Sequence, residues 1–183
     1  MGWSARAGAH RKVGAGAEVC TFVGGKDGEF GKKQGGMVVQ AIGEKGKVGL
    51  IYGALGTSAQ VLREQGLNEY LKDHPGIEIV AKQTANWDNA QALAVTQDWF
   101  SKYPSGQLAA IIDQGPEGVS GAQWAVQNGR TDLKFLMGDY PADVKKAIAD
   151  GTLYGTVNQD PLPQGVTAVE HALTDTPLGR MTI

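Results

Sequence analysis

The sequence predicts an α/β fold, a doubly wound and mostly parallel sheet with helices on both faces. Two observations support this prediction. Short apolar runs alternate with helix-like segments of ten to fifteen residues, and glycine or proline separates most of them. Six strand–helix alternations follow one another in this way, which is the pattern of successive βαβ units with right-handed crossovers.

The predicted elements follow in chain order, and local signals set their ends. Thr57-Ser58 caps one helix and Pro75-Gly76 ends it, while Pro141 opens another helix that stops at Gly151. The expected strands are 19–23, 47–52, 77–81, 108–112, 135–137 and 153–157. The first expected helix ends near residue 42, and the others cover 58–73, 89–103, 116–128, 141–150 and 162–173.

Composition divides the chain into three parts. Residues 1–17 are rich in Gly and Ala, show no period, and are interpreted as a disordered or non-native leader. Residues 18–160 carry the strand–helix alternation and form the predicted α/β lobe. Residues 161–183 hold one more helix and a short tail.

Composition also excludes several classes of protein. The 183 residues suffice for one domain with its own core, and the net charge of −2 argues against a nucleic-acid or anionic-membrane surface. The single Cys20 excludes an internal disulfide and a cysteine-based metal cluster. The sequence has no apolar run long enough to span a bilayer, and its start lacks the apolar region of a secretory signal peptide. We therefore expect a cytoplasmic protein or a mature or engineered form of an exported one.

Motifs for catalysis and cofactor binding do not fit. The run GGKDGEFGKKQGG fails as a phosphate loop, because Lys33 stands where Ser or Thr would bind Mg²⁺. Neither GxGxxG nor GxSxG is present, and His10, His74 and His171 are far apart. The fold class permits an enzyme of flavodoxin-like architecture, but fold does not imply function, and neither a nucleophile–base pair nor a cofactor loop supports one. We therefore expect no metal, no cofactor and no enzymatic activity.

Polar residues gather where the predicted strands end, and the carboxyl ends of parallel strands meet at one edge of a sheet. Carboxylates, an amide and a guanidinium bind paired hydroxyls, and an indole stacks on the C–H face of a sugar ring. Taken alone, any one of these side chains also fits a helix-capping role. Together they predict a site for a small polar ligand of the sugar type. The candidate ligand-binding residues are Asp27, Arg63, Trp87, Asp113, Asp139 and Gln159.

Three motifs give the chain a resemblance to a known family. They are GTSA at 56–59 with Arg63-x-x-Gly66, then ANWD at 85–88, and then the ladder from Asp139 to Gln159 that contains KAIxxGxL and TVxQ. From about Val19 to Leu173 the chain resembles the ribose-binding-protein-like periplasmic sugar-binding proteins. These are the type I substrate-binding proteins of ABC transporters. Members of the family are two-lobed clamps that close over a monosaccharide or similar ligand and perform no chemistry.

The resemblance implies a role for each matching position. Arg63 would hydrogen-bond sugar hydroxyls, Trp87 would stack on the ring, and Asp139 would take a pair of hydroxyls. Gln159 would contact the ligand at a hinge crossing, and Asp27 lies where the family crosses from its first lobe into its second. The implied partners are a sugar and an ABC transporter permease, and the implied location is periplasmic or extracytoplasmic.

The chain departs from the family pattern in two ways. At Asp113-Gln114-Gly115 the family usually carries Asn-Asp, so Asp113 or Gln114 would substitute. The family's first lobe would precede Val19, so we expect residues 18–160 to be the second lobe and 161–183 to belong to the missing first lobe. The chain would then be the solute-binding component of an ABC transporter, truncated to about one lobe.

Two alternatives to this function follow from the same residues. A last helix without its packing partner would expose Val166, Val169, Ala172 and Leu173, which predicts a self-associating module that exchanges this segment within a homodimer. A sugar-sensing regulatory lobe is the second alternative. Residues 1–17 are too short and too rich in Gly to supply the helix-turn-helix of a repressor.

Overall fold

The computed structural model describes residues 6–7 and 21–174. The chain forms two compact units. We call the first, Asp27–Gln159, the α/β unit. The second, the terminal unit, consists of Met1–Lys26 and Asp160–Ile183.

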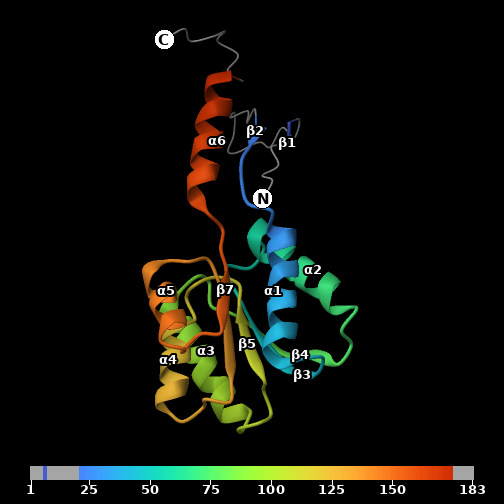
Figure 1. Cartoon of the computed structure of the whole chain (residues 1–183), viewed down its shortest axis with the longest axis vertical. Helices are drawn as coiled ribbons and strands as arrows, with labels where there is room; N and C mark the ends of the chain where they lie inside the picture. The colour runs from blue at the N-terminus through green and yellow to red at the C-terminus, as the bar shows by residue number, and fades with distance from the viewer. Residues whose placement is uncertain (1–5, 8–20, 175–183) are drawn as a thin grey trace. The chain divides into compact units, whose positions relative to one another are not determined.

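The α/β unit is a five-stranded sheet of order β4-β3-β5-β6-β7 with helices on both faces (Figure 1). Each neighbouring pair of strands is parallel, so the predicted fold class is confirmed. The strands are β3 (Gly46–Tyr52), β4 (Ile77–Thr84), β5 (Ala110–Asp113), β6 (Lys134–Gly138) and β7 (Gly155–Val157). The helices are α1 (Asp27–Ile42), α2 (Ser58–Leu71), α3 (Asn89–Lys102), α4 (Val119–Gln127) and α5 (Ala142–Ala149).

Alternating side chains of the central strands separate two apolar layers. On β3, Val48 and Leu50 pack with α1 and α2, whereas Ile51 packs with α3, α4 and α5. On β6, Leu136 joins the first layer and Phe135 the second. All five side chains are buried. A strand that is covered on both faces is apolar at successive positions, which is why these strands are visible in the sequence.

Helices α1 and α2 pack closely because glycines meet where they touch. A Cβ on Gly31 would lie 1.9 Å from the carbonyl oxygen of Arg63, and a Cβ on Gly66 would lie 1.9 Å from that of Gly28. Any side chain at these positions would force the helices apart. The contact therefore fixes Arg63 beside the first turns of α1.

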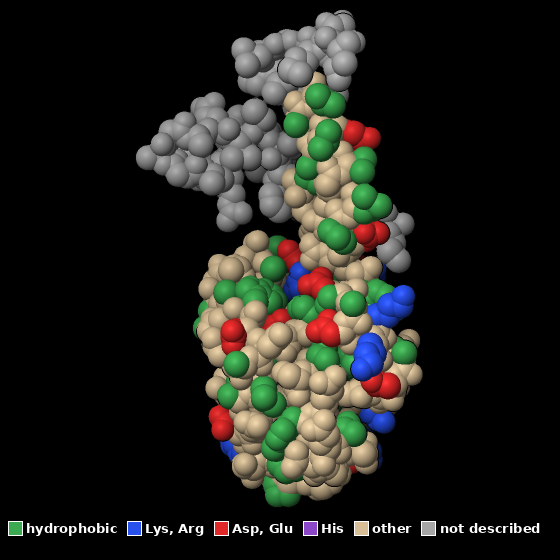
Figure 2. All heavy atoms as spheres, turned by 90° about the vertical axis from the view of Figure 1, so that its left-hand side faces the viewer, with side chains coloured by type: hydrophobic (Ala, Val, Ile, Leu, Met, Phe, Trp, Pro, Cys, Tyr) green, Lys and Arg blue, Asp and Glu red, His purple; other side chains and the backbone are tan. Residues whose placement is uncertain are grey.

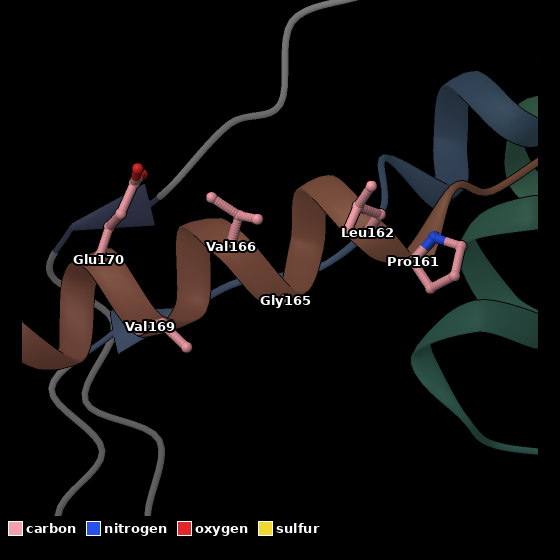
Figure 3. Close-up of a pocket in the computed structure, with 6 residues that line it drawn as sticks. All are labelled: Pro161, Leu162, Gly165, Val166, Val169 and Glu170. Carbon is pink, nitrogen blue, oxygen red and sulfur yellow. The ribbon is translucent and has the colours of Figure 1, made fainter.

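The terminal unit contains a short antiparallel pair and one helix. Strand β1 (Arg6–Ala7) pairs with β2 (Thr21–Phe22), and α6 spans Pro161–Thr174, close to the predicted 162–173 (Figure 1). Large apolar side chains are exposed along α6 (Figure 2). In Figure 3, Leu162 and Val166 project from the same side of the helix. An open hollow on α6 is lined by Pro161, Leu162, Gly165, Val166, Val169 and Glu170.

The predicted first strand does not join the parallel sheet. Residues 21–22 of the expected strand 19–23 form β2, which pairs antiparallel with β1 in the terminal unit. An apolar run that ends at a glycine turn indicates a strand but does not specify its partner. The α/β unit begins at Asp27.

Residues 1–5, 8–20 and 175–183, which include most of the predicted leader and tail, lie outside the described residues. Within the described residues, no helix has both the length and the hydropathy needed to cross a membrane.

Candidate functional site

Arg63 lies at the centre of a polar cluster at the carboxyl ends of the strands, and only 4% of it is exposed. Its Nε donates to Asp27 Oδ1 at 2.9 Å, one Nη donates to the Gln114 carbonyl oxygen at 2.6 Å, and the other donates to Gln159 Oε1 at 2.6 Å. Asp27 and Gln159 are the first and last residues of the α/β unit. One guanidinium therefore ties both ends of this unit to the edge of the sheet, which we call the rim.

Two aromatic rings flank the Arg63 guanidinium. Its Cζ lies 3.9 Å from the centroid of the Phe30 ring and 5.9 Å from that of Trp87. A guanidinium is weakly hydrated and stacks well on aromatic faces, so the rings stabilise the charge in this buried place. Three of the five N–H groups of an arginine are used within the protein. The other two have no acceptor among the described residues.

Trp87 is positioned by a strained backbone and by two glycines. Asn86 and Trp87 have φ values of 53° and 61°, a region that residues other than glycine seldom adopt and that is costly for a bulky side chain. A Cβ on Gly53 would lie 1.9 Å from the indole Cζ2, and a Cβ on Gly115 would lie 2.9 Å from Cε3. The indole therefore lies across the chain just beyond β3 and β5, and 38% of Trp87 stays exposed.

Asp139 follows β6 in a turn with φ of 60°. Its N–H donates to the carbonyl oxygen of Val157 at 2.8 Å, and its own carbonyl oxygen accepts from the Thr156 hydroxyl, so β7 holds the turn. The half-buried carboxylate has no hydrogen-bond partner among the described residues. Burial raises the pKa of the Asp139 carboxyl; Arg63 opposes this rise and Asp27 adds to it.

Asp113, at the end of β5, is fully buried and lies beside a second buried carboxyl, Glu117. Asp113 Oδ1 accepts from the N–H of Gly115 at 3.1 Å. Burial, and then the neighbouring Glu117, raise the pKa of the Asp113 carboxyl well above its usual range. Burial also raises the pKa of the Glu117 carboxyl. Because two adjacent buried carboxyls repel each other when both are ionised, each one makes ionisation of the other more costly.

The structure brings five of the predicted residues together at the rim and buries the sixth. Arg63 bonds Asp27 and Gln159, Trp87 flanks its guanidinium, and its charge acts on Asp139. Asp113 is fully buried. The part that these residues play in ligand binding stays a prediction.

The sequence reasoning missed Glu117. Only its spacing, four residues after Asp113 and just before a helix, pointed to the same edge of the sheet. That position is also typical of an ordinary acidic residue near a helix start. Gln114, the alternative to Asp113 for the family's usual Asn-Asp position, is buried and donates from Nε2 to the Gln60 carbonyl oxygen at 2.9 Å.

The acidic residues that the structure describes do not assemble a metal centre. In the part of the chain that the structure describes, no group of three or more His, Cys, Asp and Glu side chains is placed to hold a metal ion. The rim instead combines carboxylates, an anchored guanidinium and an exposed indole, which is a set of groups that binds by hydrogen bonding and stacking.

Comparison with known proteins identifies the family. Residues 10–174 match the family described as the periplasmic binding protein domain, and the chain belongs to this family. The resemblance that the motifs indicated is thereby confirmed.

Individual relatives agree with this assignment. The chain is similar to the ribose import binding protein of Escherichia coli K12, with 31% identity over 156 residues, which are 85% of this chain and 52% of that protein. It is 29% identical over 125 residues to the xylitol-binding protein of Mycolicibacterium smegmatis, covering 68% of this chain and 36% of that one. The chain thus spans about half the length, or less, of these curated relatives.

A solved structure shows the same arrangement of elements. It is an ABC transporter periplasmic solute binding protein from Actinobacillus succinogenes with bound D-allose. The TM-score is 0.74 at 28% identity, and the match covers 83% of this chain and 53% of that one.

Proposed function

We propose that the rim binds a monosaccharide or a similar polyol, and that the chain serves as a solute-binding component of an ABC transporter. The observation that carries this proposal is that two groups available to a ligand lie beside the anchored Arg63. Trp87 exposes an indole face, and the Asp139 carboxylate has no partner in the described part of the chain. A sugar ring offers C–H groups to the first and hydroxyl donors to the second.

Each rim residue has a distinct role in the proposed complex. The Trp87 indole stacks on the apolar face of the ring, where the two glycines leave it room. The Asp139 carboxylate accepts from two neighbouring hydroxyls, and the remaining Arg63 N–H groups donate to ring oxygens. Asp27 and Gln159 hold the guanidinium in place. These groups bind and orient a ligand, and the proposal includes no chemical step.

The relatives support a wider assembly. Binding proteins for ribose, xylitol and D-allose are among the proteins that this chain resembles. By analogy we propose an extracytoplasmic location and a transporter permease as partner. Because the chain spans about half of such relatives, we propose that a second wall, opposite the rim, completes the site. The rim alone then binds weakly.

Titration calorimetry of the full chain against a panel of monosaccharides tests the proposal. We expect a Kd on the order of millimolar for at least one sugar, as fits a half site. Asp139→Ala should abolish detectable binding, whereas Asp150→Ala, an exposed residue of the α5–β7 turn, should not change it. An unchanged affinity in Asp139→Ala would sink the assignment of the rim as the binding site.

One observation favours a second function, self-association through α6. Leu162, Val166 and Val169 are 71%, 50% and 60% exposed in the described structure, and all three line the open hollow on this helix (Figure 3). Light scattering of the full chain should show a dimer that Val166→Asp and Val169→Asp convert to a monomer. A wild-type chain that is already monomeric at high concentration would exclude this function.

A further inference from the structure

Acidic groups outnumber basic ones at the rim. The charge of Arg63 is matched by Asp27 at 2.9 Å. Asp113, Glu117 and Asp139 bring three further carboxyl groups to this end of the sheet. Among the described residues, none of the ion pairs involves these three carboxyls. Figure 2 shows acidic side chains, with basic ones beside them, at the upper end of the α/β unit, where the strands end.

Among these carboxyls, Glu117 is the one best placed to bind a cationic ligand group. It is 2% exposed, and neither of its oxygens receives a hydrogen bond from a donor in the described structure. A Cβ on Gly115 would lie 2.2 Å from Glu117 Oε2 and 2.9 Å from the indole of Trp87. The carboxyl and the exposed indole therefore flank the same point, so Glu117 is directed towards the rim. Its charge also interacts there with Asp139 and Arg63.

These groups match one kind of ligand group. An ammonium carries three N–H donors and no acceptor, so it satisfies carboxylate oxygens without offering them a lone pair. An exposed indole beside the carboxylates adds cation–π attraction. A buried carboxyl is costly to ionise unless a cation lies beside it. A ligand cation therefore gains most binding free energy beside Glu117 and Asp139. The same carboxyl groups would repel a ligand that carries a carboxylate.

We propose that the rim selects hydroxylated rings that carry a protonated amine, as amino sugars do, over neutral sugars, and that it excludes sugar acids. This inference rests on the proposed function and adds the charge class of the ligand. The residues that set the class are Glu117 and Asp139, with Trp87 as the aromatic face.

Saturation-transfer NMR of the full chain tests the ranking. The probes are the amino sugar, the neutral parent sugar and the uronate of the gluco, galacto and manno series, at a pH where the amine is protonated. Within each series that binds, we expect the amino sugar to bind about tenfold more tightly than the parent, as for one partly buried charge pair, and the uronate not to bind. Raised salt should narrow this ratio.

Variants assign the preference to the rim. Glu117→Gln and Asp139→Asn keep the shapes of the side chains and should reduce the ratio between amino and neutral sugars towards one. Asp98→Asn removes the same charge from an exposed position on α3 and should leave the ratio unchanged. If Glu117→Gln fails to fold, Asp139→Asn alone decides the matter.

The outcomes separate the two proposals. Neutral sugars that bind as well as amino sugars, or uronates that bind better, overturn the charge preference and leave sugar binding standing. A preference that survives in both rim variants overturns the assignment to these residues. If no sugar of any charge binds at millimolar concentration, the proposed function itself fails, and the charge preference with it.

Discussion

Replacing Arg63 by methionine tests the idea that one guanidinium organises the rim. The Arg63 and Asp27 side chains are 5% and 15% exposed and 2.9 Å apart, so this ion pair is largely buried. Removing one partner from a buried pair costs about 3–5 kcal/mol, because the other charge is left uncompensated. The hydrogen bonds to Gln114 and Gln159 are lost as well. Water that reaches the half-buried Asp27 offsets part of the loss. We expect the free energy of unfolding to fall by about 3 kcal/mol.

Urea unfolding followed by circular dichroism at neutral pH measures this loss. The matched control is Lys32→Met, which removes a lysine on α1 whose partners Glu29 and Glu69 are exposed, so that we expect little change in stability. Adding Asp27→Asn to the Arg63 variant should recover about 1–2 kcal/mol, because the orphaned charge disappears. If the Arg63 variant loses no more stability than the Lys32 control, the guanidinium does not tie the ends of the α/β unit together.

Two further predictions concern the indole and the carboxyl pair. Gly53→Ala should displace the Trp87 indole and destabilise the fold by about 1–3 kcal/mol. The emission of Trp87, identified as the fluorescence that is lost in Trp87→Phe, should then shift to longer wavelength. Unchanged emission would show that the indole does not lie across Gly53. The raised pKa values of Asp113 and Glu117 mean that the folded state binds protons more tightly than the unfolded chain. Their contribution to stability is therefore complete below the ordinary carboxyl pKa and is lost as pH rises through the raised values. Glu117→Gln should flatten this fall in urea midpoints as pH rises above the ordinary carboxyl pKa, and a slope equal to that of the wild type would argue against the coupling of the two carboxyls.

The parts of the fold that the sequence predicted are those encoded by local pattern. Strands covered on both faces left continuous apolar runs, and glycine or proline marked the ends of helices. The partner of a strand is a long-range property, and Thr21–Phe22, within the expected strand 19–23, pairs with β1 instead of joining the parallel sheet. The order β4-β3-β5-β6-β7 likewise required the structure.

The rim was predictable in outline because the carboxyl ends of parallel strands always share an edge. What could not be read was the direction of each side chain. Asp113 lies on the same strand as Ile111, two residues on, so it turns into the layer with α4 rather than out to the rim. The position of Glu117 beside Trp87 depends on the turn that follows β5, and the sequence did not predict the shape of that turn.

The central claim is that the rim is the surface that binds a sugar. Titrating the isotope-labelled full chain with the best-binding sugar, and following the backbone and indole N–H resonances, tests it directly. The account predicts that shifts concentrate on the Trp87 indole and the backbone N–H groups of Gly53, Gly115 and Asp139. Shifts confined to α6, or to Gly106 and Thr131 at the opposite edge of the sheet, would contradict it.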